Sequence, residues 1–321
     1  MRVVIVGAGM AGLACARGLV DAGHEVALID KGRGPGGRMS SRRVAVGSGE
    51  VVFDHGAPFF HVSDPAFAER VLRWRAEGHV APWPPAGEGA WVGTPSMNGP
   101  LRAMAADLDV QWGARVEQLA HTPEGWSVVT DSGGVCKADS IVVALPEEQA
   151  FVLLEPVNAG FTTHIQGAGS SPCWTLMQAF SAPLPFLQDC IRGDDNTALG
   201  WAVRNSAKPG RVGIEAWVVH AGSAWSARHL YMPPDQVEAA MTSALFEAIG
   251  VAPRVPMARA VHRWRYARSR PQGLCVLWNP LLMLGVCGDW LLGETVESAW
   301  LSGTCLAQQI ATLPDPLSVG T

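Results

Sequence analysis

The N-terminal stretch RVVIVGAGMAGLACARGLVDAGHEVALID, residues 2–30, runs from a short apolar segment through a glycine-rich turn to a second apolar segment that ends at Asp30. The turn, GAGMAG, directly follows the first apolar segment and opens a helix-like one. This order is the one that a βαβ dinucleotide-binding fold requires. Gly7 permits the tight turn, Gly9 lets the backbone approach a pyrophosphate, and Gly12 allows close packing of helix on strand. We therefore expect a Rossmann-type α/β domain that binds a dinucleotide.

The residues that open the predicted helix would supply the phosphate site. Unpaired backbone N–H groups at a helix N-terminus, together with the partial positive charge there, favour a bound anion. Asp30 would accept hydrogen bonds from a ribose diol. The alternative is an ordinary glycine turn in another α/β protein, which the combination of these features disfavours. The expected cofactor contacts at this end are Gly7, Gly9, Met10, Ala11, Gly12, Asp30 and Lys31.

A second glycine element, Gly36-Gly37-Arg38, follows just past the acid. It places another close backbone approach, and a guanidinium suited to phosphate, near the same pyrophosphate. Residues 30–41 resemble the FAD-binding start of the glutathione-reductase-like flavoproteins, in the branch that holds amine oxidases, carotene desaturases and renalase. NAD dehydrogenases generally lack this element, so the resemblance favours FAD, with Gly37 and Arg38 among its contacts. No cysteine or histidine lies in a linkage motif, and we expect the FAD to be non-covalent.

The length and composition of the chain limit the classes of protein to which it can belong. The 321 residues are enough for two domains or one large α/β unit, and 48% hydrophobic residues predict a large buried core. The net charge of −5 provides no basic surface for nucleic acid. Seven cysteines, without a CxxC pair, indicate free thiols of a reducing compartment rather than disulfides or a metal site. The N-terminal apolar run belongs to the glycine motif, not to a signal peptide. No run approaches about 18 apolar residues, so we expect a cytoplasmic protein without a membrane span.

The chain is expected to pass more than once between two domains. We expect an FAD-binding domain from residues 1–79, 94–150 and 271–321, and a discontinuous substrate domain from residues 80–93 and 151–270. Longer strands followed by an amphipathic helix predict an antiparallel sheet with flanking helices in the substrate domain. The expected helices are 65–77, 100–107, 235–249 and one from about residue 296, and the expected strands are 43–46, 50–53, 110–112, 126–130, 141–144, 174–180, 199–204, 213–219, 275–278 and 282–286.

The C-terminal segment extends the same resemblance. Gly288-Asp289 follows a strand-like run, and a predicted helix begins near Val296. In flavoproteins of this branch the carboxylate lies near the ribityl chain and pyrophosphate, and the helix N-terminus points at the pyrimidine edge of the flavin. That N-terminus would stabilise the negative charge of reduced flavin. The alternative is an ordinary strand–turn–helix with a capping acid. Residues 113–119 resemble the family segment whose valine, here Val116, brackets the adenine.

Three further segments narrow the resemblance to the bacterial renalase-like proteins. They are DHGAPFF at residues 54–60, VGTPSM at residues 92–97 and HRWRYA at residues 262–267. With the two ends of the chain, the likeness covers most of its length. Two positions depart from the family pattern: Pro58 stands where the family usually has glutamine, and Thr295 where an arginine commonly precedes Val-Glu. Both positions would face the substrate, so the departures concern the substrate more than the cofactor.

The resemblance implies oxidation of the 2- and 6-dihydro isomers of NAD(P)H. Hydride would pass to flavin N5, and dioxygen would reoxidise the flavin, which yields NAD(P)+ and hydrogen peroxide. A dihydropyridine that loses hydride becomes an aromatic pyridinium, so no side chain has to remove a proton. We therefore name no catalytic acid or base, and expect catalysis to be mostly placement of the ring. The substrate contacts that the resemblance implies are Gly56, Ala57, Pro58, Phe59, Phe60, Gly93, Thr94, Pro95, Thr175, Trp264 and Thr295.

One predicted strand alternates aromatic rings with arginines. His262, Trp264 and Tyr266 would lie on one face of it. Arg263 and Arg265 would lie on the other. The rings could form a wall for a flat substrate, and an arginine could meet its phosphates. A packed strand with solvated arginines is the alternative.

A flavin amine oxidase of the monoamine or polyamine type is the main alternative function. Such enzymes commonly hold a lysine near flavin N5 and an aromatic cage for the amine. Lys31 belongs to the dinucleotide end, Lys137 lies between predicted strands, and Lys208 lies in a Lys-Pro-Gly turn, so no lysine is well placed. A lipid desaturase would need an apolar membrane-facing stretch, which we do not find. A flavin-binding sensor without turnover also stays open. The expected partner is a dihydronicotinamide dinucleotide isomer or an amine, with dioxygen.

Overall fold

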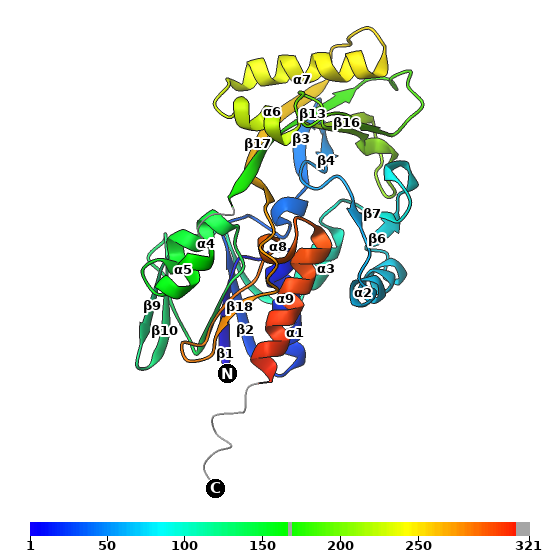
Figure 1. The fold of residues 1–321 in the computed structure, drawn as a ribbon. Coiled ribbons are helices and arrows are strands. Elements are labelled where there is room, and N and C mark those ends of the chain that lie inside the picture. The colour runs from blue at the N-terminus through cyan, green and yellow to red at the C-terminus, as the bar shows by residue number, and fades with distance from the viewer. Residues whose placement is uncertain (166–168, 313–321) are drawn as a thin grey trace. The chain divides into compact units, whose positions relative to one another are not determined.

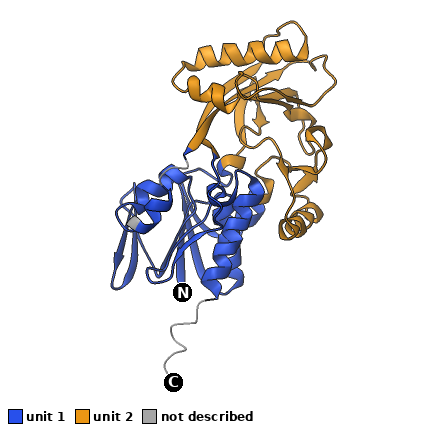
Figure 2. Ribbon diagram, viewed as in Figure 1, with its two compact units in different colours: residues 1–37, 101–169, 269–321 blue, residues 38–100, 170–268 orange. Residues whose placement is uncertain are grey.

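The computed structural model describes residues 1–165 and 169–312, which form two compact units (Figure 1, Figure 2). The expected domain stretches 151–270 and 271–321 include residues 166–168 and 313–321, which lie outside the described residues. Within the described part, no helix is both long and apolar enough to cross a membrane. All seven cysteines are free thiols. The units comprise residues 1–37, 101–169 and 269–321 (unit 1), and residues 38–100 and 170–268 (unit 2).

Unit 1 is built on a six-stranded sheet with the order β18-β19-β12-β1-β2-β8 (Figure 1). The central strand β1 pairs in parallel with β2 and β12, and these pair in parallel with β8 and β19. Only β18 runs antiparallel to its neighbour in this sheet. The apolar run 3–6 is buried on both faces, as a central parallel strand requires. The bounds are β1 Arg2–Val6, β2 Glu25–Asp30, β8 Asp109–Trp112, β12 Ser140–Val143, β18 Leu277–Asn279 and β19 Leu284–Val286.

Both faces of this sheet are covered within unit 1. Val4 and Val6 pack in one apolar cluster with Trp126 of a three-stranded antiparallel sheet, β11-β10-β9, and with helices α4 and α5. Helices α1 and α9 pack together so closely that a Cβ at Gly303 would lie 2.1 Å from the Ala11 carbonyl oxygen. The bounds are β9 Val116–Thr122, β10 Gly125–Thr130, β11 Val135–Ala138, η1 Gly37–Met39, α1 Met10–Asp21, α3 Gly99–Ala105, α4 Glu147–Leu154, α5 Ala159–Ile165, α8 Asp289–Leu292 and α9 Val296–Ala311.

Unit 2 is built on a five-stranded sheet with the order β14-β15-β16-β13-β17 (Figure 1). A hairpin, β3-β4, a small sheet, β5-β7-β6, and three helices complete the unit. The bounds are β3 Arg42–Val46, β4 Gly49–Phe53, β5 Phe60–His61, α2 Pro65–Ala76, β6 Val80–Pro82, η2 Pro84–Ala86, β7 Ala90–Gly93, β13 Ser170–Phe180, β14 Cys190–Arg192, β15 Trp201–Arg204, η3 Asn205–Ala207, β16 Glu215–His220, α6 Ser223–Arg228, α7 Pro234–Ile249 and β17 Ala258–Ser269.

The two faces of the five-stranded sheet carry different side chains because successive strand residues point to opposite sides. Leu176 and Trp217 belong to the apolar cluster that contains Val237 and Met241 of α7, and α7 runs along this face (Figure 1). Gln178 of β13 donates to the hydroxyl of Thr242 on the same helix at 2.8 Å. The even-numbered residues of β13 therefore face α7, and its odd-numbered residues point to the opposite face.

Every helix and strand expected from the sequence is present, with ends that differ by a few residues. The division into units differs from the expected domains. Residues 38–79 and 94–100 were expected in the FAD-binding domain and cluster with unit 2. The described residues of 151–169, together with 269–270, were expected in the substrate domain and cluster with unit 1. Apolar side chains of α4 and α5, such as Leu153 and Phe161, pack in the core of unit 1. Pro146 precedes α4 without ending the unit.

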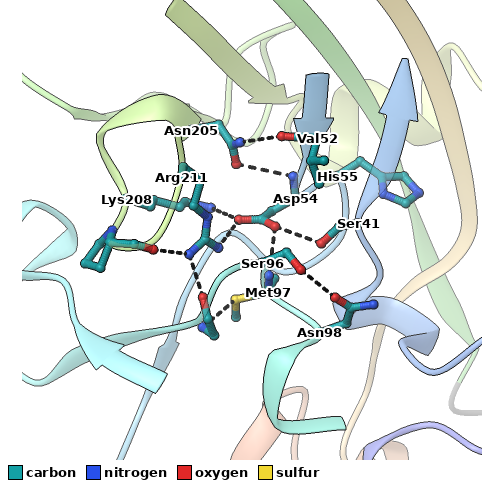
Figure 3. Close-up of polar contacts among 12 residues, drawn as sticks. Ser41, Val52, Asp54, His55, Ser96, Met97, Asn98, Asn205, Lys208 and Arg211 are labelled. Carbon is teal, nitrogen blue, oxygen red and sulfur yellow. Dashed lines mark hydrogen bonds and ion pairs between the residues drawn. The ribbon is translucent and has the colours of Figure 1, made fainter. Parts of the chain in front are cut away.

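A buried ion cluster joins residues 38–100 to the rest of unit 2 (Figure 3). The Asp54 side chain is 1% exposed, and its Oδ2 lies 3.1 Å from Lys208 Nζ. Arg211 Nη2 contacts the same oxygen. Oδ1 accepts hydrogen bonds from the Ser41 hydroxyl and from the Met97 backbone N–H, both at 2.8 Å. One carboxylate therefore holds the hairpin, the loop after β7 and the loop after β15 in one place.

Further hydrogen bonds around Asp54 link the same stretches of the chain. Asn205 accepts a hydrogen bond from the Asp54 backbone N–H at 3.2 Å and donates to the Val52 carbonyl at 2.9 Å. Arg211 also donates to the Gly93 carbonyl at 2.6 Å. The two cations hold the pKa of Asp54 well below its ordinary range, although burial alone acts in the opposite direction. The carboxylate is therefore charged across the physiological pH range.

Asp54→Asn should destabilise the protein by about 3–5 kcal/mol, because it leaves two buried cations without their counter-ion. The matched control is Glu50→Gln on the same hairpin, where the exposed pair with Arg43 is 3.3 Å long. Its loss should cost about 0–1 kcal/mol. Urea unfolding followed by tryptophan fluorescence measures both. An Asp54→Asn protein as stable as the Glu50→Gln protein would contradict the role given to this cluster.

Candidate functional site

The glycine turn at the start of α1 has the geometry of a phosphate site. Gly7 has φ of 105°, and a Cβ there would lie 2.5 Å from the Ala144 carbonyl oxygen. A Cβ at Gly12 would lie 1.9 Å from the Gly7 carbonyl oxygen. Gly9 differs: its φ is −80°, and no heavy atom lies within 4 Å of the position of its Cβ. The fold itself requires glycine at positions 7 and 12. Gly9 instead leaves open space where a ligand's phosphate would approach.

The N-terminus of α1 is suited to an anion. Its N-cap residue is Gly9, so no side chain caps the helix, and its first turn holds no acidic residue. The second glycine element lies beside it, because a Cβ at Gly37 would be 3.4 Å from the Gly9 Cα. The expectation that these two elements meet is confirmed. The residues present here fit the pyrophosphate of FAD.

Asp30 ends β2 and organises the neighbouring loops. Its Oδ2 accepts a hydrogen bond from the Ala8 N–H at 2.7 Å, and its Oδ1 accepts one from the Gly32 N–H at 2.6 Å. The Asp30 carbonyl accepts from the Ala114 N–H at 3.1 Å. The segment that leads to Val116 therefore lies beside the acid, as the expected adenosine site requires. Lys31, the next residue, donates to the Gln149 side chain at 2.8 Å.

The C-terminal element is also part of unit 1. Gly288 donates its N–H to the Ser302 hydroxyl at 3.0 Å, and Asp289 is buried at the start of the short helix α8. Val296 opens α9, whose N-cap is Thr295, with its hydroxyl accepting from the Ser298 N–H at 3.0 Å. Thr295 was expected to contact the substrate, and the structure gives its hydroxyl a helix-capping role. A contact between Thr295 and substrate stays a prediction.

The substrate residues expected between 56 and 60 serve different purposes in unit 2. Gly56 has no room for a side chain, since a Cβ there would lie 1.9 Å from the Arg38 carbonyl oxygen, and the Ala57 N–H donates to that oxygen at 2.8 Å. Phe60 is buried, with its ring 6.0 Å from that of Phe67. The Phe59 ring lies 6.2 Å from the Trp83 ring, and Pro58 is half-buried.

The loop with Gly93, Thr94 and Pro95 packs against the Lys-Pro-Gly turn. A Cβ at Gly93 would lie 2.4 Å from the Met97 carbonyl oxygen, and Thr94 donates its N–H to the His79 carbonyl at 2.8 Å. A Cβ at Gly210 would lie 3.0 Å from the Pro95 Cα. These contacts give the loop a structural role. Contact of the loop with substrate stays a prediction.

The face of the five-stranded sheet opposite α7 carries a row of polar and aromatic side chains. Thr175 is the cross-strand partner of His220, and His220 is also the partner of Trp201 on the next strand. Cross-strand partners share one face, so the three side chains lie side by side. The Phe59 ring lies 5.2 Å from the Trp201 ring in an edge-to-face contact. Trp264 lies on β17, the neighbour of β13.

Three histidines and a tryptophan meet at this row. The His55 ring lies 5.0 Å from the rings of both His262 and Trp264, and the latter two rings are 4.5 Å apart. The His55 carbonyl lies 2.9 Å from Trp264 Nε1, which donates to it, and 3.3 Å from His220 Nε2. We call Thr175, His220, Trp264, His55 and His262 the histidine face. The expected alternation on β17 is confirmed for His262 and Trp264.

The histidine face is uncharged at neutral pH. Burial lowers the pKa of His55 to about 3 and that of His220 to about 4, and it also lowers the pKa of His262. Nearby cations act in the same direction: Arg42 on His55 and His262, and Lys208 and Arg268 on His220. The charged side chains that lower these pKa values are therefore cations.

Arg263 does not extend from β17 as a free phosphate ligand. Its Nη1 donates to the Leu230 carbonyl at 2.5 Å, and its guanidinium lies 5.3 Å from the centre of the Trp174 ring. The expectation that this arginine meets substrate phosphates therefore competes with a packing role. Arg265, on the same strand, is exposed.

Sequence reasoning missed two residues of this region. The Lys-Pro-Gly segment is a turn, as expected, but the Lys208 side chain is fully buried beside Asp54 and lies 5.7 Å from the centre of the Trp83 ring. Burial lowers the pKa of Lys208 to about 8. His220 ends strand β16 directly after the apolar run 216–219, and that break in the pattern was the available signal. Among the described residues, no group of histidine, cysteine and acidic side chains could hold a metal ion.

Gly9→Ala should weaken FAD binding by about tenfold or more, because the added methyl group enters the space left for the pyrophosphate. Apoprotein stability should fall by less than about 1 kcal/mol, the scale of an N-cap change. Gly12→Ala is the contrasting variant and should destabilise the apoprotein, since its Cβ meets backbone. FAD titration by fluorescence quenching and thermal unfolding measure the two effects. Unchanged FAD affinity in Gly9→Ala would refute this placement.

Stability should fall as the pH drops from about 6.5 toward 4. The folded histidine face resists protonation, whereas histidines in the unfolded chain bind protons near their ordinary pKa of about 6.5. The unfolded state therefore binds more protons in this window, and the free energy of unfolding rises with pH across it. His220→Gln should make the slope shallower. Urea unfolding at pH 7 and pH 5 measures the difference, and equal slopes in both proteins would contradict the assignment.

Two family models match the chain. One, described as an NAD(P)-binding Rossmann-like domain, matches residues 5–73. The other, described as flavin containing amine oxidoreductase, matches residues 84–311, which is more than half of the chain. The first match covers the glycine turn and His55, and the second includes the other four residues of the histidine face and the C-terminal element.

Solved structures share the fold at low sequence identity. A protein from Exiguobacterium sp. 255-15, described as a protoporphyrinogen oxidase, has a TM-score of 0.75 at 10% identity, over 97% of this chain and 98% of that chain. Cyclohexylamine oxidase from Brevibacterium oxydans IH-35A has a TM-score of 0.70 at 14% identity, over the same shares of the two chains. These likenesses show the fold alone.

A curated protein from Synechococcus elongatus, described as a zeta-carotene desaturase, is 61% identical over 41 residues. The match covers 13% of this chain and 8% of that protein, so it says nothing of a shared substrate. The long family match carries the assignment, and the open phosphate site at Gly9 agrees with it. The chain belongs to the flavin-containing amine oxidase family and is an FAD-dependent oxidoreductase.

Proposed function

We propose that this flavoenzyme is a renalase-like oxidase of the 2- and/or 6-dihydro isomers of NAD(P), with dioxygen as electron acceptor and NAD(P)+ and hydrogen peroxide as products. The observation that carries the proposal is that the charged side chains acting on the uncharged histidine face are cations. Arg42, Arg268 and Lys208 are the charged side chains that act on the pKa values of its histidines.

This electrostatic setting favours an anionic substrate over a cationic one. A dinucleotide carries phosphates, which the cations would attract, whereas a protonated amine would be repelled. Asp54 does not reverse this balance, because its charge is shared between Lys208 and Arg211. The rings of Trp264 and His55 supply flat apolar surface for a nicotinamide ring.

The histidine face is also consistent with a reaction that needs no proton transfer. Bound FAD supplies the hydride acceptor. Loss of hydride from a dihydropyridine forms an aromatic ring directly, so the side chains only have to bind and orient the substrate. Histidines with low pKa values remain neutral in this role and do not act as general acids at neutral pH.

A flavin-dependent amine oxidase is the second candidate. The family match and the likeness to a cyclohexylamine oxidase favour it. Trp201, Trp264 and Phe59 could contribute to an aromatic cage for an amine. The lysine expected near flavin N5 in such enzymes has no clear counterpart, because Lys208 is engaged by Asp54.

Anaerobic mixing of the FAD-loaded protein with aged NADH, which contains the isomers, tests the proposal. The flavin absorbance should bleach with the isomer mixture and not with pure 4-dihydro NADH, and admission of air should restore the colour and release hydrogen peroxide. A panel of amines serves as the parallel arm. If only an amine bleaches the flavin, the second candidate is the function. If no compound bleaches it, the protein binds flavin without turnover.

A further inference from the structure

The histidine face contains a pair of buried polar atoms that the fold does not satisfy. Thr175 is 0% exposed and His220 is 7% exposed, and they are direct cross-strand partners on β13 and β16. Thr175 Oγ1 and His220 Nδ1 make no hydrogen bond of ordinary distance and angle among the described residues, although the Cys173 thiol lies close enough to interact with the Thr175 hydroxyl. Each unsatisfied buried group costs about 1–3 kcal/mol. Two such atoms side by side indicate a ligand group that pairs with both.

The hydrogen-bonding roles of the two atoms follow from their surroundings. His220 Nε2 lies 3.3 Å from the His55 carbonyl oxygen, which can only accept, so Nε2 carries the proton. Because the ring is neutral, Nδ1 presents a lone pair. The Thr175 hydroxyl can donate or accept. The pair therefore offers one fixed acceptor and one donor on the same face of the sheet.

We propose that Thr175 and His220 bind the primary carboxamide of the substrate: its N–H donates to His220 Nδ1, and its carbonyl accepts from the Thr175 hydroxyl. This inference rests on the proposed function, in which the substrate carries a nicotinamide ring. A carboxamide presents both a donor and an acceptor on one planar group, which matches the pair. Trp264 and His55, 5.0 Å apart, lie next to the pair and supply flat surface for the ring.

Other small groups match this pair less well. A carboxylate has no proton for the lone pair of His220 Nδ1. An ammonium group could donate to both atoms, but Lys208 and Arg268 act on His220 as like charges. A bound water could satisfy the pair without any substrate role, and this is the occupant that the test must exclude.

The test compares two ligands of the FAD-loaded protein that differ only at the carboxamide. NAD+ carries the amide, and 3-acetylpyridine adenine dinucleotide replaces its NH2 with a methyl group and keeps the carbonyl. Dissociation constants come from calorimetry, without turnover. The wild type should bind NAD+ about tenfold more tightly, the scale of one hydrogen bond of about 1.4 kcal/mol.

Three variants separate the two contacts. His220→Gln keeps a donor for the His55 carbonyl and removes the Nδ1 acceptor, so it should bind both ligands alike. His220→Asn places an acceptor oxygen near the position of Nδ1 and should retain the preference for NAD+. Thr175→Val should weaken both ligands about equally, by about tenfold. Thr242→Val is the control, because Thr242 pairs with Gln178 on the opposite face of the same sheet.

Thermal unfolding and FAD content confirm that each variant is folded, and the two replacements at His220 provide separate readings if one is unstable. Equal affinity of the wild type for both ligands, or an undiminished preference in His220→Gln, would overturn the subsite and assign the pair to water. If the isomer mixture still bleaches the flavin in that case, the proposed function stands. If neither dinucleotide binds and the isomers do not react, both proposals fail.

Discussion

The architecture of unit 2 depends on one buried carboxylate. Asp54 accepts contacts from Lys208, Arg211, Ser41 and the Met97 backbone, and these come from three stretches that are distant in sequence. A buried ion pair is weak evidence for net stability, but loss of one partner is costly. Its value here is specificity: the charges define one arrangement of the hairpin and two loops. The next residue, His55, is thereby held at the histidine face.

The same cluster shapes the chemistry of the face. It contains two cations and one anion, and its Lys208 acts on His220 as a like charge. Burial and these cations together keep the histidines neutral, so His220 retains a lone pair. A structural ion cluster and a candidate binding surface are therefore coupled through electrostatics. Under the proposed function, this coupling would favour a substrate with phosphates and an uncharged ring.

Local features of the fold could be predicted from the sequence, whereas contacts between distant segments could not. The helix at 235–249 and the hairpin of strands 43–46 and 50–53 follow from periodicity and turn residues, and both are present. The borders of the two units differ from the expected domain borders, and the Asp54 contacts that tie part of residues 38–79 to Lys208 could not be seen in the sequence. Nothing local to Lys208 indicates burial, since a lysine beside Pro-Gly ordinarily marks an exposed turn. Its partner lies 154 positions away.

The sequence by itself determined a dinucleotide site, because the glycine turn and Asp30 act through backbone geometry that a short segment specifies, and the family resemblance of residues 30–41 favoured FAD as the dinucleotide. It also indicated Thr175 and Trp264 through family resemblance, without their neighbours. Only the tertiary structure placed Thr175 beside His220 and His55. Strand register and burial decide which polar atoms face one another and which remain unpaired, and both arise from pairings between distant segments.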